Sequence, residues 1–420
     1  MALHLTERER AIAAGEAGNA AGIAMRLVAD TARLMGAPRL IPVASAHIDG
    51  ALYHGPSGTL FAERLVEGGG RAAVRATLNV GALDLTGCSR QRLDGEDRAM
   101  AARMMRAYRA LGCEPTWTCA PYQAGHRPQA GTDVAWGESN AVVFCNSVLG
   151  ARTNRYGDFL DIACAISGRA PDYGLHRPEN RRATFVFDLS AMPGALQAEA
   201  SVWPVLGALY GRLAGERVGV ITGVSSHPGE DALKAFGAAA ASSGAVGLFH
   251  MAGVTPEAPD AETALGGARP GEMIRLDAKA FREARNALST VTPDRRIDAV
   301  AIGSPHLSAD ELGMLETLIA GRRLAVPLYA CTGRHSLAML GGERRKALEA
   351  LGVIVVADTC VVVTPILPET GNGVLMTNSG KFAHYAPGNT GYGVVFGSLA
   401  DCVESAVTGR ITFLPGVPWS

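Results

Sequence analysis

Cysteine, carboxylate and arginine side chains are concentrated in one stretch of the chain, residues 115–158. It contains Cys119, the pair Glu138-Ser139, Arg152 and Arg155. A loop cysteine near a proline can present a thiolate to a metal, and arginine binds carboxylates through two parallel hydrogen bonds. The alternative interpretations are a small buried thiol for the cysteine and interdomain salt bridges for the arginines. We expect this stretch to combine a metal ligand with a substrate-binding surface, with Glu138 and Ser139 among the catalytic groups.

The apolar segment at residues 141–151, AVVFCNSVLGA, carries polar groups where a buried helix would be apolar. Its Asn146 is followed by Ser147, and Asn154 lies shortly after it. Burying an amide without a hydrogen bond costs free energy, so these side chains indicate a wall that faces something polar. We predict that Asn146 and Asn154 bind substrate.

Further reactive side chains follow strand-like runs in the first part of the chain. The run 40–43 ends in SAHIDG, which predicts a loop that carries Ser45 and His47, and the run 72–78 ends in Asn79. Ligands of parallel α/β sheets bind beyond the carboxyl ends of the strands. His47 is therefore a candidate acid or base, with a structural histidine as the alternative. Ser45 and Asn79 are candidate substrate ligands.

The last third of the chain repeats this arrangement after the runs DAVAIG, VIVVADT and GVLMT. The side chains that follow these runs are Ser304, His306, Cys360, Asn378, Ser379 and Lys381. Among them we expect Lys381 to be catalytic, and His306, Asn378 and Ser379 to bind substrate. Lys381 begins a predicted helix, where an ammonium and unpaired backbone N–H groups can hold a carboxylate or phosphate; a solvated lysine is the alternative. Ser308 and Glu311 form a capping-box pattern that predicts another helix start.

Length and composition indicate a multidomain α/β protein. A chain of 420 residues with 48% hydrophobic residues and 51 glycines suits two or three domains with many tight turns. The alternation of strand-like and helix-like segments predicts βαβ units around parallel sheets. We place domains at residues 1–200, 201–290 and 291–420, with a smaller α/β domain in the middle.

Several classes of protein are disfavoured. The net charge of −1 and the lack of a basic stripe argue against nucleic acid as a partner. No apolar run of membrane-spanning length and no signal-like N-terminus occur, so we expect no membrane association and a cytoplasmic protein. Neither the phosphate-binding loop G-x-x-x-x-G-K-[ST] nor the nucleophile elbow G-x-S-x-G is matched.

Long motifs spread over almost the whole chain are similar to one known family. They include IPVASAHIDG, RATLNVGALDL, TCAPYQAG, WGESNAVVFCNSVLGARTNR, GLHRPENR, GSPHLS, DTCVVV and TNSGKFAHY. In these motifs the chain resembles the large, catalytic component of the aconitase X family.

The resemblance implies an aconitase-superfamily α/β fold with the active site between domains and a dehydratase reaction on a small hydroxy acid. The cofactor that it implies is an iron–sulfur cluster, of the 2Fe-2S or 3Fe-4S type, or a single iron. The preferred substrate is cis-3-hydroxy-L-proline, converted to a pyrroline carboxylate. The alternative is mevalonate 5-phosphate. Family cluster cysteines map onto Cys119 and Cys360.

Two departures from the family pattern bear on catalysis. The third cluster position holds Ser304 instead of cysteine, and no segment of the chain matches the loop of the small swivelling component. We therefore expect a separate small subunit as a partner. A metal-poor homologue that acts as a subunit or binding protein is the alternative from another class.

Overall fold

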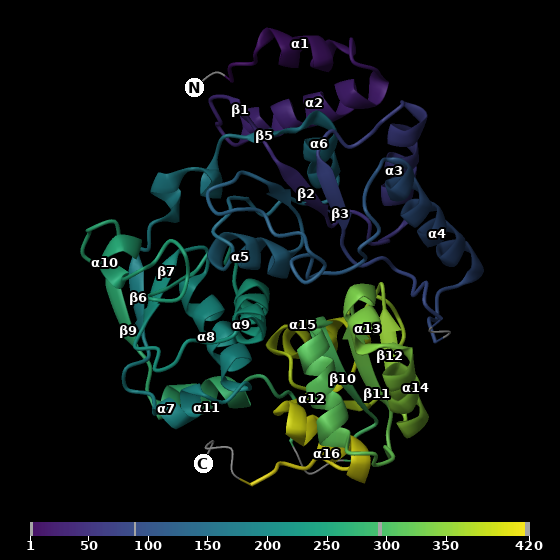
Figure 1. Cartoon of the computed structure of the whole chain (residues 1–420), viewed down its shortest axis with the longest axis vertical. Coiled ribbons are helices and arrows are strands. Elements are labelled where there is room, and N and C mark those ends of the chain that lie inside the picture. The colour runs from purple at the N-terminus through teal and green to yellow at the C-terminus, as the bar shows by residue number, and fades with distance from the viewer. Residues whose placement is uncertain (1–2, 88–89, 293–295, 416–420) are drawn as a thin grey trace. The chain divides into compact units, whose positions relative to one another are not determined.

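The computed structural model describes residues 3–87, 90–292 and 296–415. These residues divide into two compact units, which Figure 1 shows with their helices and strands. Unit 1 comprises residues 1–83 and 93–181, and unit 2 comprises residues 84–92 and 182–420. The short segment 84–92 thus belongs to unit 2, although the residues before and after it in the sequence belong to unit 1.

The central sheet of unit 1 is parallel and has the strand order β3-β2-β4. Its strands are β2 (Ser45–Ile48), β3 (Arg75–Leu78) and β4 (Ala135–Trp136). β2 lies in the middle, with His47 opposite Thr77 on β3 and opposite Trp136 on β4. A separate antiparallel pair joins β1 (Leu40–Pro42) to β5 (Arg169–Pro171). The three parallel strands therefore deliver their carboxyl ends to one edge.

Helices surround this sheet. They are α1 (Glu7–Ala14), α2 (Asn19–Leu34), α3 (Pro56–Glu67), α4 (Gly95–Ala110), α5 (Ser139–Ser147) and α6 (Leu160–Ser167), with the 3-10 turns η1 (Gly174–His176) and η2 (Pro178–Arg181). α6 packs against β2 and against α2. Because α6 is apolar apart from Asp161 and Ser167, it is buried between the sheet and α2.

Unit 2 begins with a parallel sheet of order β8-β7-β6-β9. Its strands are β6 (Phe185–Asp188), β7 (Gly219–Thr222), β8 (His250–Met251) and β9 (Glu272–Arg275). The accompanying helices are α7 (Gly194–Gln197), α8 (Val202–Ala214), α9 (Glu230–Ser243), α10 (Ala261–Ala264) and α11 (Ala278–Asn286). β6, at residues we placed at the end of the first domain, pairs with β7 and β9.

The C-terminal part of unit 2 is a second parallel sheet, with the order β12-β11-β10-β13-β14. Its strands are β10 (Ala299–Leu307), β11 (Leu328–Thr332), β12 (Val353–Ala357), β13 (Val374–Thr377) and β14 (Gly393–Phe396). The accompanying helices are α12 (Ala309–Ile319), α13 (Arg334–Leu340), α14 (Gly342–Leu351), α15 (Gly380–Thr390) and α16 (Leu399–Thr408).

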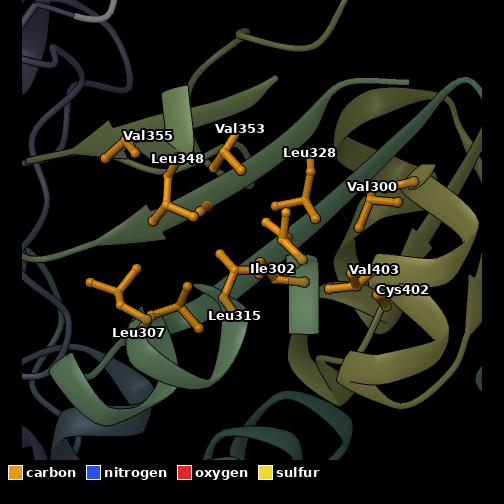
Figure 2. Close-up of a cluster of buried hydrophobic side chains, with 14 of the residues drawn as sticks. Val300, Ile302, Leu307, Leu315, Leu328, Leu348, Val353, Val355, Cys402 and Val403 are labelled. Atoms are coloured by element: carbon orange, nitrogen blue, oxygen red, sulfur yellow. The ribbon is translucent and has the colours of Figure 1, made fainter. Parts of the chain in front are cut away.

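Aliphatic side chains from these strands and helices fill the core of this second sheet. Figure 2 shows Val300 and Ile302 of β10 among neighbours that include Leu315 of α12 and Leu348 of α14. Central parallel strands are buried on both faces, which explains why they are almost continuously apolar. The predicted parallel α/β architecture is confirmed.

The predicted strand ends were wrong at two places. Ser45 and His47 lie inside β2 and not on the loop after the apolar run. Ser304 and His306 lie inside β10, which continues to Leu307 across an irregularity in its pairing with β11. Distant partners bond Ser45 Oγ, His47 Nδ1 and His306 Nε2, so the strands can continue through these polar side chains.

Close packing of α8 against α9 offers a test of the fold. A Cβ on Gly207 would overlap the backbone of Phe236, whereas a Cβ on Gly388 in α15 would meet nothing within 4 Å. We expect Gly207→Ala to lower the free energy of unfolding by about 1–3 kcal/mol through overpacking. Gly388→Ala should leave that free energy unchanged or raise it, since alanine favours helix. Urea unfolding followed by circular dichroism measures both, and equal effects would contradict the packing.

Candidate functional site

Polar side chains gather at the carboxyl edge of the sheet in unit 1. β2 is followed by Asp49, β3 by Asn79, and β4 by Gly137 and Glu138. The Asn79 amide donates a hydrogen bond to the Asp49 carboxylate. A Cβ on Gly137 would lie 2.8 Å from the Cβ of Asp49, so only glycine lets the two loops approach this closely. The edge thus carries two carboxylates and an amide close together, as expected for a ligand site of a parallel sheet.

Glu138 holds its position at this edge through backbone strain and a helix cap. Its φ of 66° is rare for a residue other than glycine, asparagine or aspartate. Its Oε2 accepts a hydrogen bond from the backbone N–H of Ala141 at 2.7 Å, which caps α5, and Ser139 Oγ donates to Oε1 at 3.3 Å. Strained residues cluster at functional sites, so the strain marks Glu138 as a candidate catalytic group.

Asp161 fixes the turn that carries Asp49, and the sequence analysis did not identify it. Its Oδ2 accepts hydrogen bonds from the backbone N–H groups of Asp49 at 2.6 Å and Gly50 at 3.1 Å. Burial raises the pKa of the Asp161 carboxyl to about 8, although the Gly50 N–H favours its ionised form. A single acidic residue in the apolar segment FLDIACA was the signal that could have revealed it.

Ser45 and His47 belong to a buried chain of hydrogen bonds in unit 1. Ser45 Oγ bonds His126 Nε2 at 2.8 Å, His126 Nδ1 bonds Thr77 Oγ1 at 2.8 Å, and Thr77 Oγ1 bonds His47 Nδ1 at 2.9 Å. Burial lowers the pKa of His126 to about 4 and that of His47 well below its usual value. His47 is fully buried in β2, so the prediction of an accessible loop histidine was wrong.

The side-chain amides of Asn146 and Asn154, which we predicted to face substrate, form hydrogen bonds within unit 1. Asn146 Nδ2 donates to the carbonyl oxygen of Thr153 at 2.9 Å, and its Oδ1 accepts from Thr153 N and from Arg181 Nη1, each at 3.0 Å. Asn154 likewise bonds the backbone of Tyr173 and Leu175. These bonds fasten the loop 151–154, and the buried Arg181 was not identified from the sequence. The predicted role of Asn146 and Asn154 in binding substrate stays a prediction.

Arg152, Arg155 and Cys119 also lie in unit 1. Arg155 is exposed, and Arg152 is half-buried, with an Nε that has no hydrogen-bond partner among the described residues. Cys119 is 7% exposed, and its carbonyl oxygen accepts a hydrogen bond from Asn140 Nδ2 at 3.0 Å. The predicted roles of these three residues in binding substrate or metal stay predictions.

The carboxyl edge of the second sheet in unit 2 carries the remaining predicted residues. Cys360 follows β12, whereas Asn378, Ser379 and Lys381 follow β13. Ser379 Oγ caps α15 by accepting from Phe382 N at 3.0 Å, and it donates to the carbonyl oxygen of Ser304. A cavity of about 30 Å³ is lined here by Ser304, Asn378 and Ser379, among other residues. The structure therefore brings these three residues together.

His306 and His335 differ in how their rings are held. His306 is fully buried and donates from Nε2 to the carbonyl oxygen of Thr359 at 3.1 Å, and burial lowers its pKa to about 3. It thus fastens the segment before Cys360. His335 follows β11, was not identified from the sequence, and neither of its ring nitrogens has a hydrogen-bond partner among the described residues. The pattern of a strand followed by TGRH was the signal available.

The predicted metal ligands are divided between the units, with Cys119 in unit 1 and Ser304 and Cys360 in unit 2. Within each unit, the described residues contain no group of three or more His, Cys, Asp or Glu side chains suited to hold a metal ion. Burial raises the pKa of several other thiols, which makes them poor thiolate ligands; these are Cys113, Cys145, Cys164 and Cys402. Cys119 and Cys360 stay the predicted thiol ligands, and Ser304 offers only an oxygen donor.

No helix in residues 3–87, 90–292 and 296–415 is both long enough and apolar enough to cross a membrane.

The raised pKa of Asp161 predicts a pH-dependent stability. In the folded chain the carboxyl keeps its proton up to about pH 8, whereas in the unfolded chain it ionises near about pH 4. The folded state binds more protons between these values, so the free energy of unfolding should fall as pH rises, by at most about 1.4 kcal/mol per pH unit.

Urea unfolding between about pH 5 and pH 8 tests this dependence. The fall of the unfolding free energy with rising pH should be smaller in Asp161→Asn, because the asparagine amide cannot ionise. It should be unchanged in Asp30→Asn, an exposed position on α2. Parallel pH profiles for the wild type and Asp161→Asn would contradict the assignment.

Family models of known proteins match nearly the whole chain. Residues 2–179 match the aconitase X first domain, residues 183–286 the second domain and residues 297–408 the third domain. The third match contains Ser304, Cys360 and Lys381, and the first contains Cys119 and Glu138.

Individual relatives agree with these matches. The chain is 43% identical to a cis-3-hydroxy-L-proline dehydratase of Pseudomonas aeruginosa over 96% of its own length and 70% of the relative's. It is 37% identical to the phosphomevalonate dehydratase large subunit of Methanothermobacter thermautotrophicus, with 94% and 96% covered. The solved structure of Thermococcus kodakaraensis aconitase X in its holo-form superimposes with a TM-score of 0.85 at 32% identity, with 96% and 100% covered. The chain belongs to the aconitase X family.

Proposed function

We propose that this protein is a hydro-lyase that dehydrates cis-3-hydroxy-L-proline to a pyrroline-2-carboxylate. The choice of substrate rests on similarity to named relatives over nearly the whole chain. Two relatives named cis-3-hydroxy-L-proline dehydratase, from Pseudomonas aeruginosa and Hypocrea jecorina, are 43% and 40% identical to it. The relatives named phosphomevalonate dehydratase large subunit are between 32% and 37% identical.

Dehydration requires a base for the proton next to the substrate carboxylate and an acid for the leaving hydroxyl. Glu138 suits one of these roles, because its carboxylate is fixed at the edge of the sheet in unit 1 by the cap of α5. Ser139 and Asn79 lie at the same edge and can orient polar groups of the substrate. His47 is deeply buried, so its part in the proposal is to hold Thr77, not to reach the substrate.

The cationic residues in the proposal bind the substrate carboxylate. Lys381 lies in the first turn of α15, where the helix N-terminus also favours an anion. Arg152 and Arg155 follow the loop after α5, and arginine suits a planar carboxylate.

Cys119 and Cys360 are the residues that would hold an iron–sulfur cluster or a single iron, with Ser304 as a third, oxygen ligand. When bound, this group supplies a Lewis acid for the leaving hydroxyl. The donor set fits such a group only in part, because a serine hydroxyl replaces the thiolate that the family pattern has at this position.

The proposal includes a small subunit as a partner, since relatives are named large subunits of phosphomevalonate dehydratase. Dehydration of mevalonate 5-phosphate is the second candidate function. It is favoured by the similar extent of this chain and the Methanothermobacter thermautotrophicus large subunit, each covered by more than nine tenths. A metal-poor homologue that acts as a subunit or binding protein is the third, and Ser304 is the residue that favours it.

An anaerobic assay separates these functions. The protein, purified without oxygen and supplemented with any small subunit encoded beside it, is incubated with the hydroxyproline isomers and with mevalonate 5-phosphate. We expect a pyrroline adduct from the cis-3 isomer and bound iron by metal analysis. Turnover of mevalonate 5-phosphate alone would select the second function, and a protein without iron or turnover would select the third.

The role of Glu138 is tested by Glu138→Gln, which keeps an oxygen able to cap α5. We expect kcat to fall by about 100-fold or more, because an amide cannot exchange the proton. Glu16→Gln, at an exposed position between α1 and α2, is the matched control and should keep the wild-type kcat. An active Glu138→Gln variant would remove Glu138 from the chemistry.

A further inference from the structure

A buried lysine of unit 2 has no part in the chemistry proposed above. Lys234 lies on α9, and its side chain is only 2% exposed. Its Nζ contacts Asp231 Oδ1 at 2.8 Å and the carboxylate of Glu311, and it donates to the carbonyl oxygen of His306 at 3.3 Å. Burial disfavours an ammonium ion, but these two carboxylates raise the pKa of Lys234, so the ion is kept.

Ser308 closes these contacts into a ring. Its Oγ donates to Asp231 Oδ2 at 2.7 Å, and its backbone N–H donates to Glu311 Oε2 at 2.8 Å. Ser308 Oγ also accepts from the backbone N–H of Glu311 at 3.1 Å, which completes the capping box of α12. We call Asp231, Lys234, Ser308 and Glu311 the Lys234 network.

The Lys234 network joins two different domains of the family. Asp231 and Lys234 belong to the matched second domain, whereas Ser308 and Glu311 belong to the third. The Lys234 network holds the last residues of β10, 304–307, together with Ser308, which follows the strand. The carbonyl oxygen of His306 is bonded directly, and Lys234 and Glu311 line the same small cavity as Ser304.

Hydrogen bonds also connect β10 with the segment that contains Cys360. The His306 ring donates to the carbonyl oxygen of Thr359 at 3.1 Å, one residue before Cys360. Thr359 Oγ1 is itself bonded to Thr364 Oγ1 at 2.8 Å. His306 therefore links Lys234 to the segment beside Cys360. Its carbonyl oxygen accepts a hydrogen bond from Lys234, and its ring donates one to the backbone of Thr359.

Stability alone is a weak reason for such a network. Replacing a buried ion pair by apolar residues of similar size is often neutral or stabilising, whereas removing one partner is costly. A buried ammonium that bonds two carboxylates and a backbone oxygen does restrict the positions of these groups, because each lost bond leaves part of a buried charge unpaired.

We infer that Lys234 is a positioning residue, which sets the geometry of Ser304 and, through His306 and Thr359, of Cys360. The inference rests on the proposed function, in which Ser304 and Cys360 are iron ligands. Lys234 itself touches neither substrate nor metal in this assignment. Its effect is to fix where the oxygen and sulfur donors lie.

The test compares Lys234→Met with a matched control in unit 1. Arg169→Met breaks another partly buried ion pair, in which Arg169 Nε lies 2.8 Å from Glu9 Oε1, and this pair joins β5 to α1. For each variant we would measure the unfolding free energy, the iron content with its electron paramagnetic resonance spectrum, and kcat and KM separately. A fourth measurement is the rate at which an alkylating reagent labels Cys360 in metal-free protein, read by mass spectrometry.

We expect Lys234→Met to change the iron spectrum, to lower kcat by about tenfold or more, and to change KM by less than about threefold. Labelling of Cys360 should also speed up by about tenfold, because its segment is released. Arg169→Met should show none of these changes even where it loses as much stability. Ser308→Ala removes one hydrogen bond and keeps the charges, so it should shift the same quantities less; it serves if Lys234→Met does not fold.

The inference is overturned if Lys234→Met, or Ser308→Ala in its place, keeps the wild-type iron spectrum, kcat and labelling rate. It is also overturned if Arg169→Met changes them equally. If wild-type protein binds no iron and turns over no substrate, the proposed function fails. The labelling rate of Cys360 in metal-free protein then decides on the positioning role by itself.

Discussion

Strands that run parallel must end at the same edge, and the candidate site depends on this constraint. In unit 1, β2, β3 and β4 deliver Asp49, Asn79 and Glu138 to one edge although these residues are far apart in sequence. In unit 2, β12 and β13 deliver Cys360 and Asn378 in the same way. The helices that return the chain between strands are apolar toward the sheet, so hydrophobic packing and the placement of polar groups are separate tasks.

Buried polar side chains fasten the loops at these edges. The Asp161 carboxylate holds the turn after β2 by accepting hydrogen bonds from the backbone N–H groups of that turn. Asn146 and Arg181 hold the loop after α5. Lys234 and His306 do the same for the end of β10. Each of these side chains bonds at least one backbone atom of the segment that it holds. Support of this kind from buried residues fixes the positions of the groups at a binding site.

The sequence was sufficient for features that depend on local patterns. Apolar runs identified the buried parallel strands, the pair Ser308 and Glu311 identified the start of α12, and long motifs identified the family. The ends of β2 and β10 were mistaken because Ser45, His47, Ser304 and His306 are polar. Their partners Thr77, His126 and Thr359 are distant in sequence, and no local pattern says that a polar side chain in a strand will find one. The bond between Asn146 and Arg181 is likewise one that no local pattern indicates.

The backbone of Glu138 has a consequence for how this chain can change over generations. The φ of 66° at Glu138 lowers the free energy of unfolding, relative to glycine at the same position, by an amount on the order of 1 kcal/mol or more. Selection for stability alone would therefore favour glycine at this position. A library of variants sorted only for folding should be enriched in this replacement. At this position the stability of the folded state and the requirements of the reaction favour different residues.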